Sequence, residues 1–305
     1  MITLDRIADV RKHCEEARQT GGSVGFVPTM GYFHEGHLSL MRAARAQHDL
    51  VVVSLFVNPT QFGPGEDLDA YPRDFDVDVP AAEAAGVDVL FAPPAGEMYP
   101  EGAVLTSVQV AGLSEGLCGG SRPHHFGGVA TVCTKLFSIV GPCTAYFGNK
   151  DFQQLRVVQR VAADLDLPVV VVGCPIVREP DGLAMSSRNA YLAPPERAAA
   201  AVLFRALRAG IEAVTARPDF ERDPSRVRAA VVETIAAEPL AELDYAEVVR
   251  AADLQPVDRI DDGVTMLVAL AVLIGRTRLI DNTTFTVDGS GISFDIDSAF
   301  RPKET

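Results

Sequence analysis

Apolar runs alternate with helical periodicities along the first half of the chain. Five short apolar runs predict buried strands, at 24–27, 50–57, 87–91, 144–147 and 169–172. Apolar residues at helical spacing predict helices at 4–19, 34–47, 76–86, 129–140 and 151–165. Strands that alternate with helices are joined by right-handed crossovers and form a parallel sheet. We therefore predict an α/β domain, in which the fully apolar run at 50–57 is covered on both faces.

The pattern changes after residue 178. Alanine-rich segments at 195–216 and 224–237 predict helices, and strand-like runs follow at 244–249, 265–274 and 278–286. Helices followed by consecutive strands are typical of an α+β domain with an antiparallel sheet. The expected domains are residues 1–178 and 179–305, which agrees with a prior of about 150 residues per domain. The tail beyond about 286 has weak periodicity and stays unplaced.

Residues 28–37, Pro-Thr-Met-Gly-Tyr-Phe-His-Glu-Gly-His, connect the first predicted strand to the next helix. The free backbone N–H groups of a helix N-terminus make such a turn an anion site. His34 and His37 share a helix face, and Gly36 between them leaves room for a flat ligand on the backbone. The pair suits stabilisation of phosphate charge. A solvated histidine pair, or a metal site lacking its third ligand, remains an alternative.

More polar residues follow the predicted strands, at the sheet edge where α/β proteins bind ligands. They are His34, Asn58, Gln61, Gly148 and Lys150. The amides of Asn58 and Gln61 can hydrogen-bond a small polar substrate without adding charge. Lys150 lies near a helix N-terminus, although a solvated lysine beside the capping Asp151 is the plainer interpretation of that stretch alone.

Two further segments carry candidate chemistry. Ser186, Ser187 and Arg188 stand near the expected domain junction and suit a triphosphate, with bidentate contacts from arginine. A solvated linker is the alternative for so short a stretch. An acidic run at 67–78 ends with Asp78. Such runs are mostly solvated, yet carboxylates plus nucleotide phosphates are the usual ligands of Mg²⁺.

Charge and cysteine content narrow the function classes. With 41 acidic against 27 basic residues the net charge is −14, which disfavours nucleic-acid and anionic-membrane partners. Five scattered cysteines without a CxxC pair indicate reduced thiols and a cytoplasmic protein, not a zinc site or a disulfide framework. Neither a signal peptide nor an apolar stretch of the roughly 20 residues that span a bilayer is evident. The glycine-rich stretch 112–128 predicts a mobile loop over the site.

In this order the motifs resemble one family, the pantoate–β-alanine ligases, over about residues 1–285. The matching words are PTMGYFHEGH, FVNPTQF, EDLDAYPR, FGGVATV, FGNKDFQQL and REPDGLAMSSRNAYL. Several words in fixed order over most of a chain are far more specific than any one of them.

The resemblance implies a Rossmann-like catalytic domain followed by a smaller lid domain. It makes His34–His37 similar to the HIGH signature of class I aminoacyl-tRNA synthetases, and Met185–Arg188 similar to their mobile KMSKS loop. The implied reaction converts ATP and pantoate to pantoyl adenylate and pyrophosphate, after which β-alanine displaces AMP. The resemblance also implies Mg²⁺ and a homodimer.

Site residues are carried over by position. The catalytic residues implied are His37, His34 and Lys150, the substrate ligands are Gln61, Gln154 and Asn58, and Asp78 is the metal candidate. The implied ATP-binding residues are Pro28, Thr29, Met30, Gly31, His34, Gly36, His37, Gly148, Asn149, Lys150, Asp151, Val177, Met185, Ser186, Ser187 and Arg188.

The chain departs from the family pattern in two places. Tyr32-Phe33 is bulkier than the pair expected before the first histidine, and residues 125–128 stand where related sequences often carry an arginine.

Two other functions stay open. One is a nucleotidyltransferase of the HxGH class acting on a small phosphate or acid. Gln61, Gln154 and the second domain favour amide ligation over this alternative. The other is a non-catalytic nucleotide-binding module, which the intact set of His34, His37, Lys150 and Arg188 disfavours.

Overall fold

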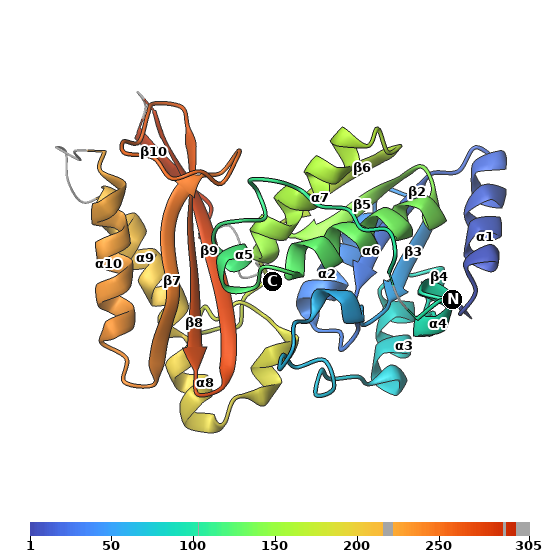
Figure 1. Cartoon of the computed structure of the whole chain (residues 1–305), viewed down its shortest axis with the longest axis horizontal. Coiled ribbons are helices and arrows are strands. Elements are labelled where there is room, and N and C mark those ends of the chain that lie inside the picture. The colour runs from blue at the N-terminus through green and yellow to red at the C-terminus, as the bar shows by residue number, and fades with distance from the viewer. Residues whose placement is uncertain (103, 216–221, 289–290, 297–305) are drawn as a thin grey trace, which may run out of the picture. The chain divides into compact units, whose positions relative to one another are not determined.

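The computed structural model describes residues 1–102, 104–215, 222–288 and 291–296, which fall into two compact units (Figure 1). Unit 1 comprises Met1–Ser114, Arg122–Asn149 and Gln154–Cys174. Unit 2 comprises the chain from Pro175 onward together with two short inserts, Glu115–Ser121 and Lys150–Gln153. Within the described ranges, no helix combines the length and apolarity needed to cross a membrane.

Unit 1 is built on a six-stranded parallel sheet with the strand order β1-β4-β3-β2-β5-β6. The strands are β1 (Ile2–Leu4), β2 (Val24–Thr29), β3 (Leu50–Leu55), β4 (Val89–Phe91), β5 (Cys143–Gly148) and β6 (Val169–Cys174). The predicted parallel α/β class is confirmed. The prediction of a helix from residue 4 is wrong at its start, because β1 occupies Ile2–Leu4 and is too short to show an alternating pattern.

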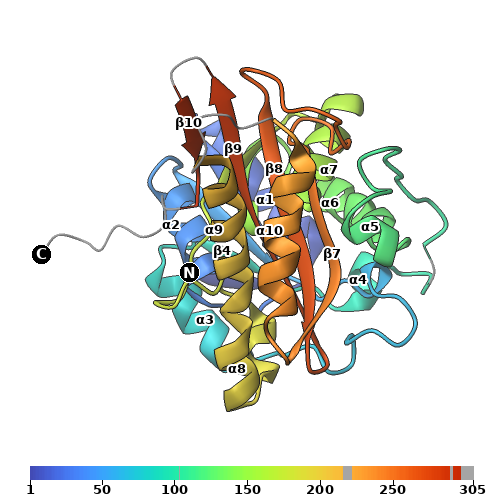
Figure 2. The same ribbon diagram turned by 90° about the vertical axis from the view of Figure 1, so that its left-hand side faces the viewer.

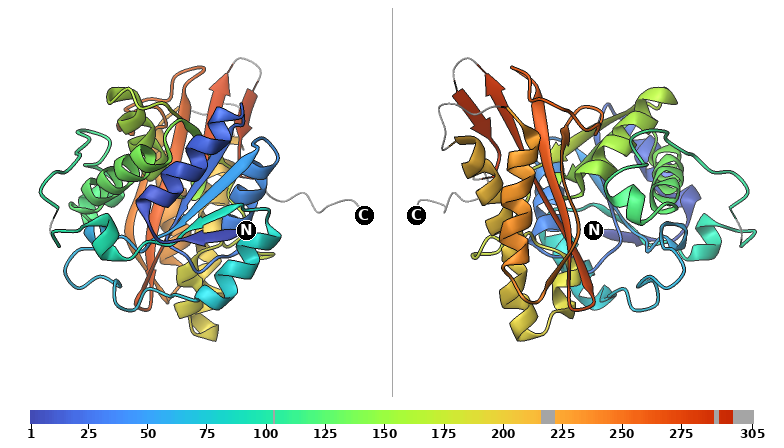
Figure 3. Two further views of the ribbon diagram at one scale, coloured as in Figure 1. Left: turned by 90° about the vertical axis from the view of Figure 1, so that its right-hand side faces the viewer. Right: turned by 60° about the vertical axis from the view of Figure 1, so that its left-hand side comes forward.

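Helices cover both faces of this sheet, as Figure 3 (left) shows. Their bounds are α1 (Ile7–Gln19), α2 (Glu35–Arg45), α3 (Phe75–Ala84), α4 (Ala95–Met98), α6 (His125–Val140) and α7 (Phe152–Asp164). Val52 packs with α1, α6 and α7 in one apolar cluster, whereas Val51 and Val53 pack with α2 and α3 in another. Alternate residues of β3 therefore face opposite layers, which explains its uninterrupted apolar sequence.

Unit 2 contains a four-stranded antiparallel sheet in the order β10-β9-β8-β7, with α9 and α10 packed on one face (Figure 2). Its strands are β7 (Ala241–Arg250), β8 (Thr265–Ile274), β9 (Thr277–Asp288) and β10 (Gly291–Phe294), and its helices α5 (Cys118–Ser121), α8 (Pro194–Ala200), α9 (Val202–Thr215) and α10 (Pro224–Ala236). The predicted antiparallel α+β part is confirmed. Part of the tail that the sequence left unplaced forms β10, and residues 297–305 lie outside the described residues.

The glycine-rich stretch 112–128 is more regular than the mobile loop expected from its composition. It contains α5 and the first turn of α6, which begins at His125. The Gln153 amide binds it twice, by accepting from Cys118 N at 3.0 Å and by donating to Gly116 O at 2.8 Å. These contacts join residues 35 and 37 positions apart, so glycine content alone could not reveal them.

Candidate functional site

The turn between β2 and α2 is strained. Gly31 and Tyr32 both lie in the left-handed region, with φ of 88° and 54°. That region is easy for glycine, but it costs a bulky residue such as Tyr32 about 1–3 kcal/mol. A Cβ at Gly31 would lie 3.0 Å from Asp78 Oδ2, so the turn is also tightly packed. Surrounding contacts must hold this conformation.

Asp78 of α3 supplies those contacts. Tyr32 N donates to Oδ2 at 2.7 Å and Phe33 N donates to Oδ1 at 2.6 Å. The side chain is 1% exposed, and this burial raises the carboxyl pKa, although both N–H bonds act in the opposite direction. Both oxygens are thus directed at the backbone. These contacts fit a backbone clamp and do not fit the magnesium ligand expected from the sequence. Among the described residues, no group of three or more His, Cys, Asp or Glu could hold a metal.

The two histidines are held in a defined orientation at the start of α2. Gly36 N donates to His34 Nδ1 at 3.1 Å, and His34 N donates to His37 Nδ1 at 3.4 Å. Their ring centroids are 4.2 Å apart. Because each Nδ1 accepts a hydrogen bond, the neutral rings carry their proton on Nε2. An anion at the helix N-terminus would therefore meet these rings through Nε2–H donors.

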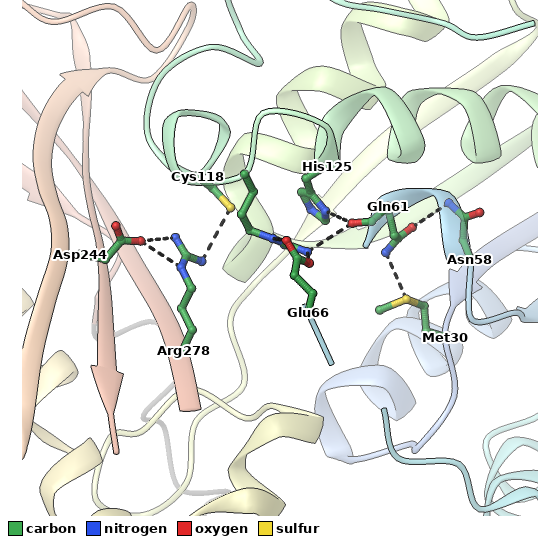
Figure 4. Close-up of polar contacts among 9 residues, drawn as sticks. Met30, Asn58, Gln61, Glu66, Cys118, His125, Asp244 and Arg278 are labelled. Carbon is green, nitrogen blue, oxygen red and sulfur yellow. Dashed lines mark hydrogen bonds and ion pairs between the residues drawn. The ribbon is translucent and has the colours of Figure 1, made fainter. Parts of the chain in front are cut away.

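Gln61, at the end of the 3₁₀ turn Pro59–Gln61 after β3, is fixed through both its side chain and its backbone (Figure 4). Its Oε1 accepts from Asn58 Nδ2 at 3.1 Å, and its Nε2 donates to Met30 Sδ at 3.1 Å. Its carbonyl oxygen accepts from His125 Nδ1 at 2.9 Å and from Arg122 Nη2 at 3.2 Å. Two predicted site residues, Met30 and Gln61, are thereby brought into contact.

Asn58 was expected to bind substrate, but the structure places it as a support for Gln61. It is 1% exposed, accepts from the Tyr99 hydroxyl at 2.7 Å and donates to Gly128 O at 3.2 Å. Gly128 is required here, because a Cβ on it would lie 2.3 Å from Thr60 O. This explains one glycine of the sequence at 125–128, where α6 crosses close to the 3₁₀ turn.

Arg122 and Glu66 form a further pair that the sequence did not reveal. Arg122 Nε donates to Glu66 Oε1 at 3.0 Å while its Nη2 reaches Gln61 O. Burial raises the pKa of Glu66, but the hydrogen bonds and charge of Arg122 outweigh it, and the net pKa is lowered. The spacing of residues 66 and 122 does not predict this contact. The one nearby feature that the sequence indicated is the departure from the family pattern at residues 125–128.

Lys150 lies in the 3₁₀ turn Asn149–Asp151, which follows β5. Its backbone carbonyl accepts from Asn282 Nδ2 of β9 at 2.8 Å. Burial lowers the pKa of Lys150, Arg188 and Arg178 lower it further, and Asp151 and Asp281 oppose them. This environment is that of a partly desolvated cation among charged neighbours, and it differs from the solvated lysine of an ordinary cap.

The segment 177–188 folds back on itself. Met185 N donates to Val177 O at 3.0 Å, which brings these two predicted ATP residues together. Ser186 caps the 3₁₀ helix Ser187–Tyr191 by accepting from Arg188 N at 3.3 Å. Ser187 is buried.

The other predicted residues occupy strand ends and helix starts. Thr29 closes β2 and uses its hydroxyl within the sheet, donating to Ser54 O at 2.6 Å. Pro28 precedes it in the same strand, Gly148 is the last residue of β5, and Gln154 lies in the first turn of α7.

A second polar cluster in Figure 4 lies within unit 2 and was not predicted. Arg278 of β9 donates to Asp244 Oδ2 through Nε at 2.9 Å and Nη2 at 2.7 Å, and contacts Cys118 Sγ at 3.7 Å. Ser121 Oγ donates to the same carboxylate at 2.8 Å. The cluster ties α5 to β7 and β9.

Comparisons with known proteins agree on one family. The family model for pantoate-β-alanine ligase matches residues 2–284. The pantothenate synthetase of Heliobacterium modesticaldum is 56% identical over 94% of this chain and 100% of its own length. That of Pelotomaculum thermopropionicum is 54% identical over 92% of this chain and 98% of its own.

Solved structures extend the agreement to the fold. Pantothenate synthetase from Thermus thermophilus superposes with a TM-score of 0.84 at 47% identity, covering 92% of this chain and 98% of its own. Pantoate-β-alanine ligase from Francisella tularensis, solved with β-γ ATP and β-alanine, has a TM-score of 0.75 at 32% identity, covering 92% and 97%. The chain therefore belongs to the pantoate–β-alanine ligase family.

Proposed function

We propose that the chain joins pantoate to β-alanine at the expense of ATP, through a pantoyl-adenylate intermediate. The family match over residues 2–284 supports the overall reaction. The observation that carries the adenylation step is the start of α2, where two histidines carry their N–H donors on Nε2 at the positive end of the helix dipole. That arrangement suits a phosphate group that gains negative charge.

In the first step a pantoate carboxylate oxygen attacks the α-phosphorus of ATP. The bond from that phosphorus to the bridging oxygen breaks, and pyrophosphate leaves. Charge that develops on the α-phosphate is stabilised by His34, His37 and Lys150, whose donors act electrostatically. Without a covalent protein intermediate, the enzyme contributes orientation and exclusion of water.

In the second step the amine of β-alanine attacks the acyl carbon of the adenylate. The acyl C–O bond breaks, AMP leaves with the electron pair, and the new amide nitrogen loses a proton. ATP and β-alanine as substrates are supported by the ligands named for the Francisella tularensis relative.

The substrate assignments in this proposal are those that the resemblance to the family implies. Gln61 and Gln154 hold pantoate, with Asn58 behind Gln61 as its support. Lys150, Ser186, Ser187 and Arg188 serve the triphosphate. The remaining predicted ATP residues are assigned to the nucleotide by the resemblance to the family, and within unit 2 the contact between Met185 N and Val177 O is compatible with this assignment.

Magnesium enters, in this proposal, as the ion carried by the phosphates of ATP, where it neutralises charge. Asp78 is not its ligand, because both carboxylate oxygens accept backbone N–H bonds in a buried position. The chain's own contribution to the phosphates comes from the donors named above.

A homodimer is what the resemblance implies, and the apolar end strand of the unit 1 sheet supports it. β6 is the last strand of that sheet, and its sequence is Val-Val-Val-Val-Gly-Cys. Val170 is 64% exposed, so the end strand presents an apolar side chain that contact with a second copy would bury. A cytoplasmic location is supported by the five cysteines, all of which are free thiols.

Pantoate-dependent exchange of labelled pyrophosphate into ATP, measured without β-alanine, tests the first step. We expect exchange only when pantoate is present, because adenylate formation is reversible and needs the carboxylate. Exchange that does not depend on pantoate would contradict the proposal, because the protein itself would then have to accept the AMP group covalently.

A further inference from the structure

A buried ion pair in unit 2 joins Arg178, the first residue of the word REPDGLAMSSRNAYL, to Asp281, which the sequence did not single out. Arg178 donates to Asp281 through Nη1 at 2.6 Å and through Nη2 at 3.0 Å, in the bidentate geometry of strong arginine–carboxylate pairs. The two side chains are 2% and 1% exposed. A buried ion pair adds little net stability over an apolar replacement, because both charges must be desolvated. The pair therefore matters chiefly for the segments that it holds in place.

Arg178 holds the segment that carries Ser186–Arg188. Its Nη1 also donates to Gly182 O at 3.0 Å, and its guanidinium lies 4.7 Å from the centre of the Phe204 ring on α9. Gly182 has a φ of 92°, and a Cβ there would lie 2.0 Å from Phe204. The turn at Gly182 is therefore fixed against α9 and β9 by one arginine.

The residue after Asp281 reaches the turn that contains Lys150. Asn282 N donates to Asp281 Oδ1 at 2.8 Å, and Asn282 Nδ2 donates to Lys150 O at 2.8 Å. Asn282 is 5% exposed, and Lys150 lies 132 positions away in the sequence. Two adjacent residues of β9 thus fix both segments that carry the proposed triphosphate ligands.

We infer that Asn282, held in place by the Arg178–Asp281 pair, is a positioning residue for Lys150 in adenylate formation. The inference rests on the proposed role of Lys150 at the phosphates. Asn282 acts through the carbonyl of Lys150, which sets where the turn, and with it the side chain, lies. Asn282 itself touches no substrate in this account.

The charges around Lys150 agree with this role. Burial lowers its pKa, and Arg188 and Arg178 add to that effect, whereas Asp151 and Asp281 oppose it. The carboxylate next to Asn282 therefore also helps to keep the ammonium charged.

A double-mutant cycle tests the inference, with pantoate-dependent ATP–pyrophosphate exchange as the readout. We expect Lys150→Ala to lower the exchange rate about 10²–10³-fold, as removal of one preorganised donor does. Asn282→Ala should lower it roughly tenfold, about the effect of 1.4 kcal/mol in a barrier. In the Lys150→Ala background, Asn282→Ala should change the rate less than about twofold, because residues that act through one another are not additive.

His37 provides the matched control, since it belongs to unit 1 and is held by the backbone of His34, whereas Asn282 binds the backbone of Lys150 in unit 2. Asn282→Ala combined with His37→Ala should give the product of the two single effects. Equal losses from Asn282→Ala with and without Lys150 would overturn the inference, and so would a wild-type rate in Asn282→Ala. Loss of pantoate-dependent exchange from the unmutated enzyme would instead contradict the proposed function.

Discussion

At the scale of single residues, the orientation of His34 and His37 follows from contacts made within five residues of sequence. Each Nδ1 accepts a backbone N–H at the start of α2, which leaves Nε2 to carry the proton. The spacing of the two histidines indicated a shared face, but the sequence could not show which nitrogen carries the proton. The position of the proton depends on the backbone N–H groups at the start of α2, which begins at Glu35.

The donor on His37 leads to a direct expectation. His37→Ala should lower the single-turnover rate of pyrophosphate release about 10²–10³-fold and leave the fold intact. His37→Gln, which keeps an N–H donor at a similar reach, should retain more activity than the alanine variant. Near-normal pyrophosphate release from His37→Ala would be incompatible with the assignment.

The strained turn gives a second expectation. Asp78→Ala should weaken ATP binding at least tenfold, because the left-handed conformation of Tyr32 loses both hydrogen bonds that hold it. In a Tyr32→Gly background, Asp78→Ala should weaken ATP binding much less, since glycine adopts this conformation without strain. Calorimetric titration of ATP into the single and double variants measures both effects. Equal losses in the two backgrounds would show that Asp78 does not act through the turn.

Gln61 and Gln154 should affect pantoate and spare ATP. Alanine at either position should weaken pantoate binding roughly tenfold, because each substitution removes a neutral side-chain amide that hydrogen-bonds the substrate. Asn58→Ala should behave like Gln61→Ala, since it removes the donor to Gln61 Oε1. Calorimetry that finds ATP affinity lost and pantoate affinity unchanged would reverse the roles.

At the scale of elements, local pattern predicted most strands and helices of both units within a few residues. The run at 265–274 coincides with β8, and the run at 50–57 covers β3 and extends just beyond its end. β1, α4, α5 and β10 were missed, because three- and four-residue elements carry no period. The supports of the site were missed for a different reason: Arg122 reaches Glu66, and Asn282 reaches Lys150, through contacts between distant segments.

The segment that carries Ser186–Arg188 is pinned at its base, which sharpens its expected role. Arg197 binds Glu179 and Asp181, each at 2.6 Å, and Asn189 Nδ2 donates to Glu179 Oε1 at 2.8 Å. The base is therefore fixed, and the hydroxyls and guanidinium at 186–188 are the part that a triphosphate would engage.

Arg188→Ala should slow adenylate formation about 10²-fold or more. Attack of β-alanine on supplied pantoyl adenylate should change little, because pyrophosphate has already left by then. Rapid-quench measurement of the two half-reactions separates these effects. Equal slowing of both would indicate general damage to the site and would contradict a role at the triphosphate.

At the scale of the whole molecule, the order of residues along the chain and their grouping in space differ. Sequence reasoning assigned continuous domains, 1–178 and 179–305, whereas the inserts Glu115–Ser121 and Lys150–Gln153 group with the C-terminal unit. Lys150 thereby shares a unit with Ser186–Arg188, and His34 and His37 belong to the other. Pattern along the chain cannot anticipate such inserts, because they depend on Gln153 and Asn282 binding distant backbone groups.

The central claim is that pantoate is activated as an acyl adenylate. Pantoate labelled with ¹⁸O in its carboxylate tests this most directly, in a complete reaction with ATP and β-alanine followed by mass spectrometry of the products. We expect one ¹⁸O atom to be transferred to the phosphate of AMP, with unlabelled pyrophosphate and an equal amount of pantothenate. Label in inorganic phosphate together with ADP would mean attack at the γ-phosphorus, and it would contradict the claim.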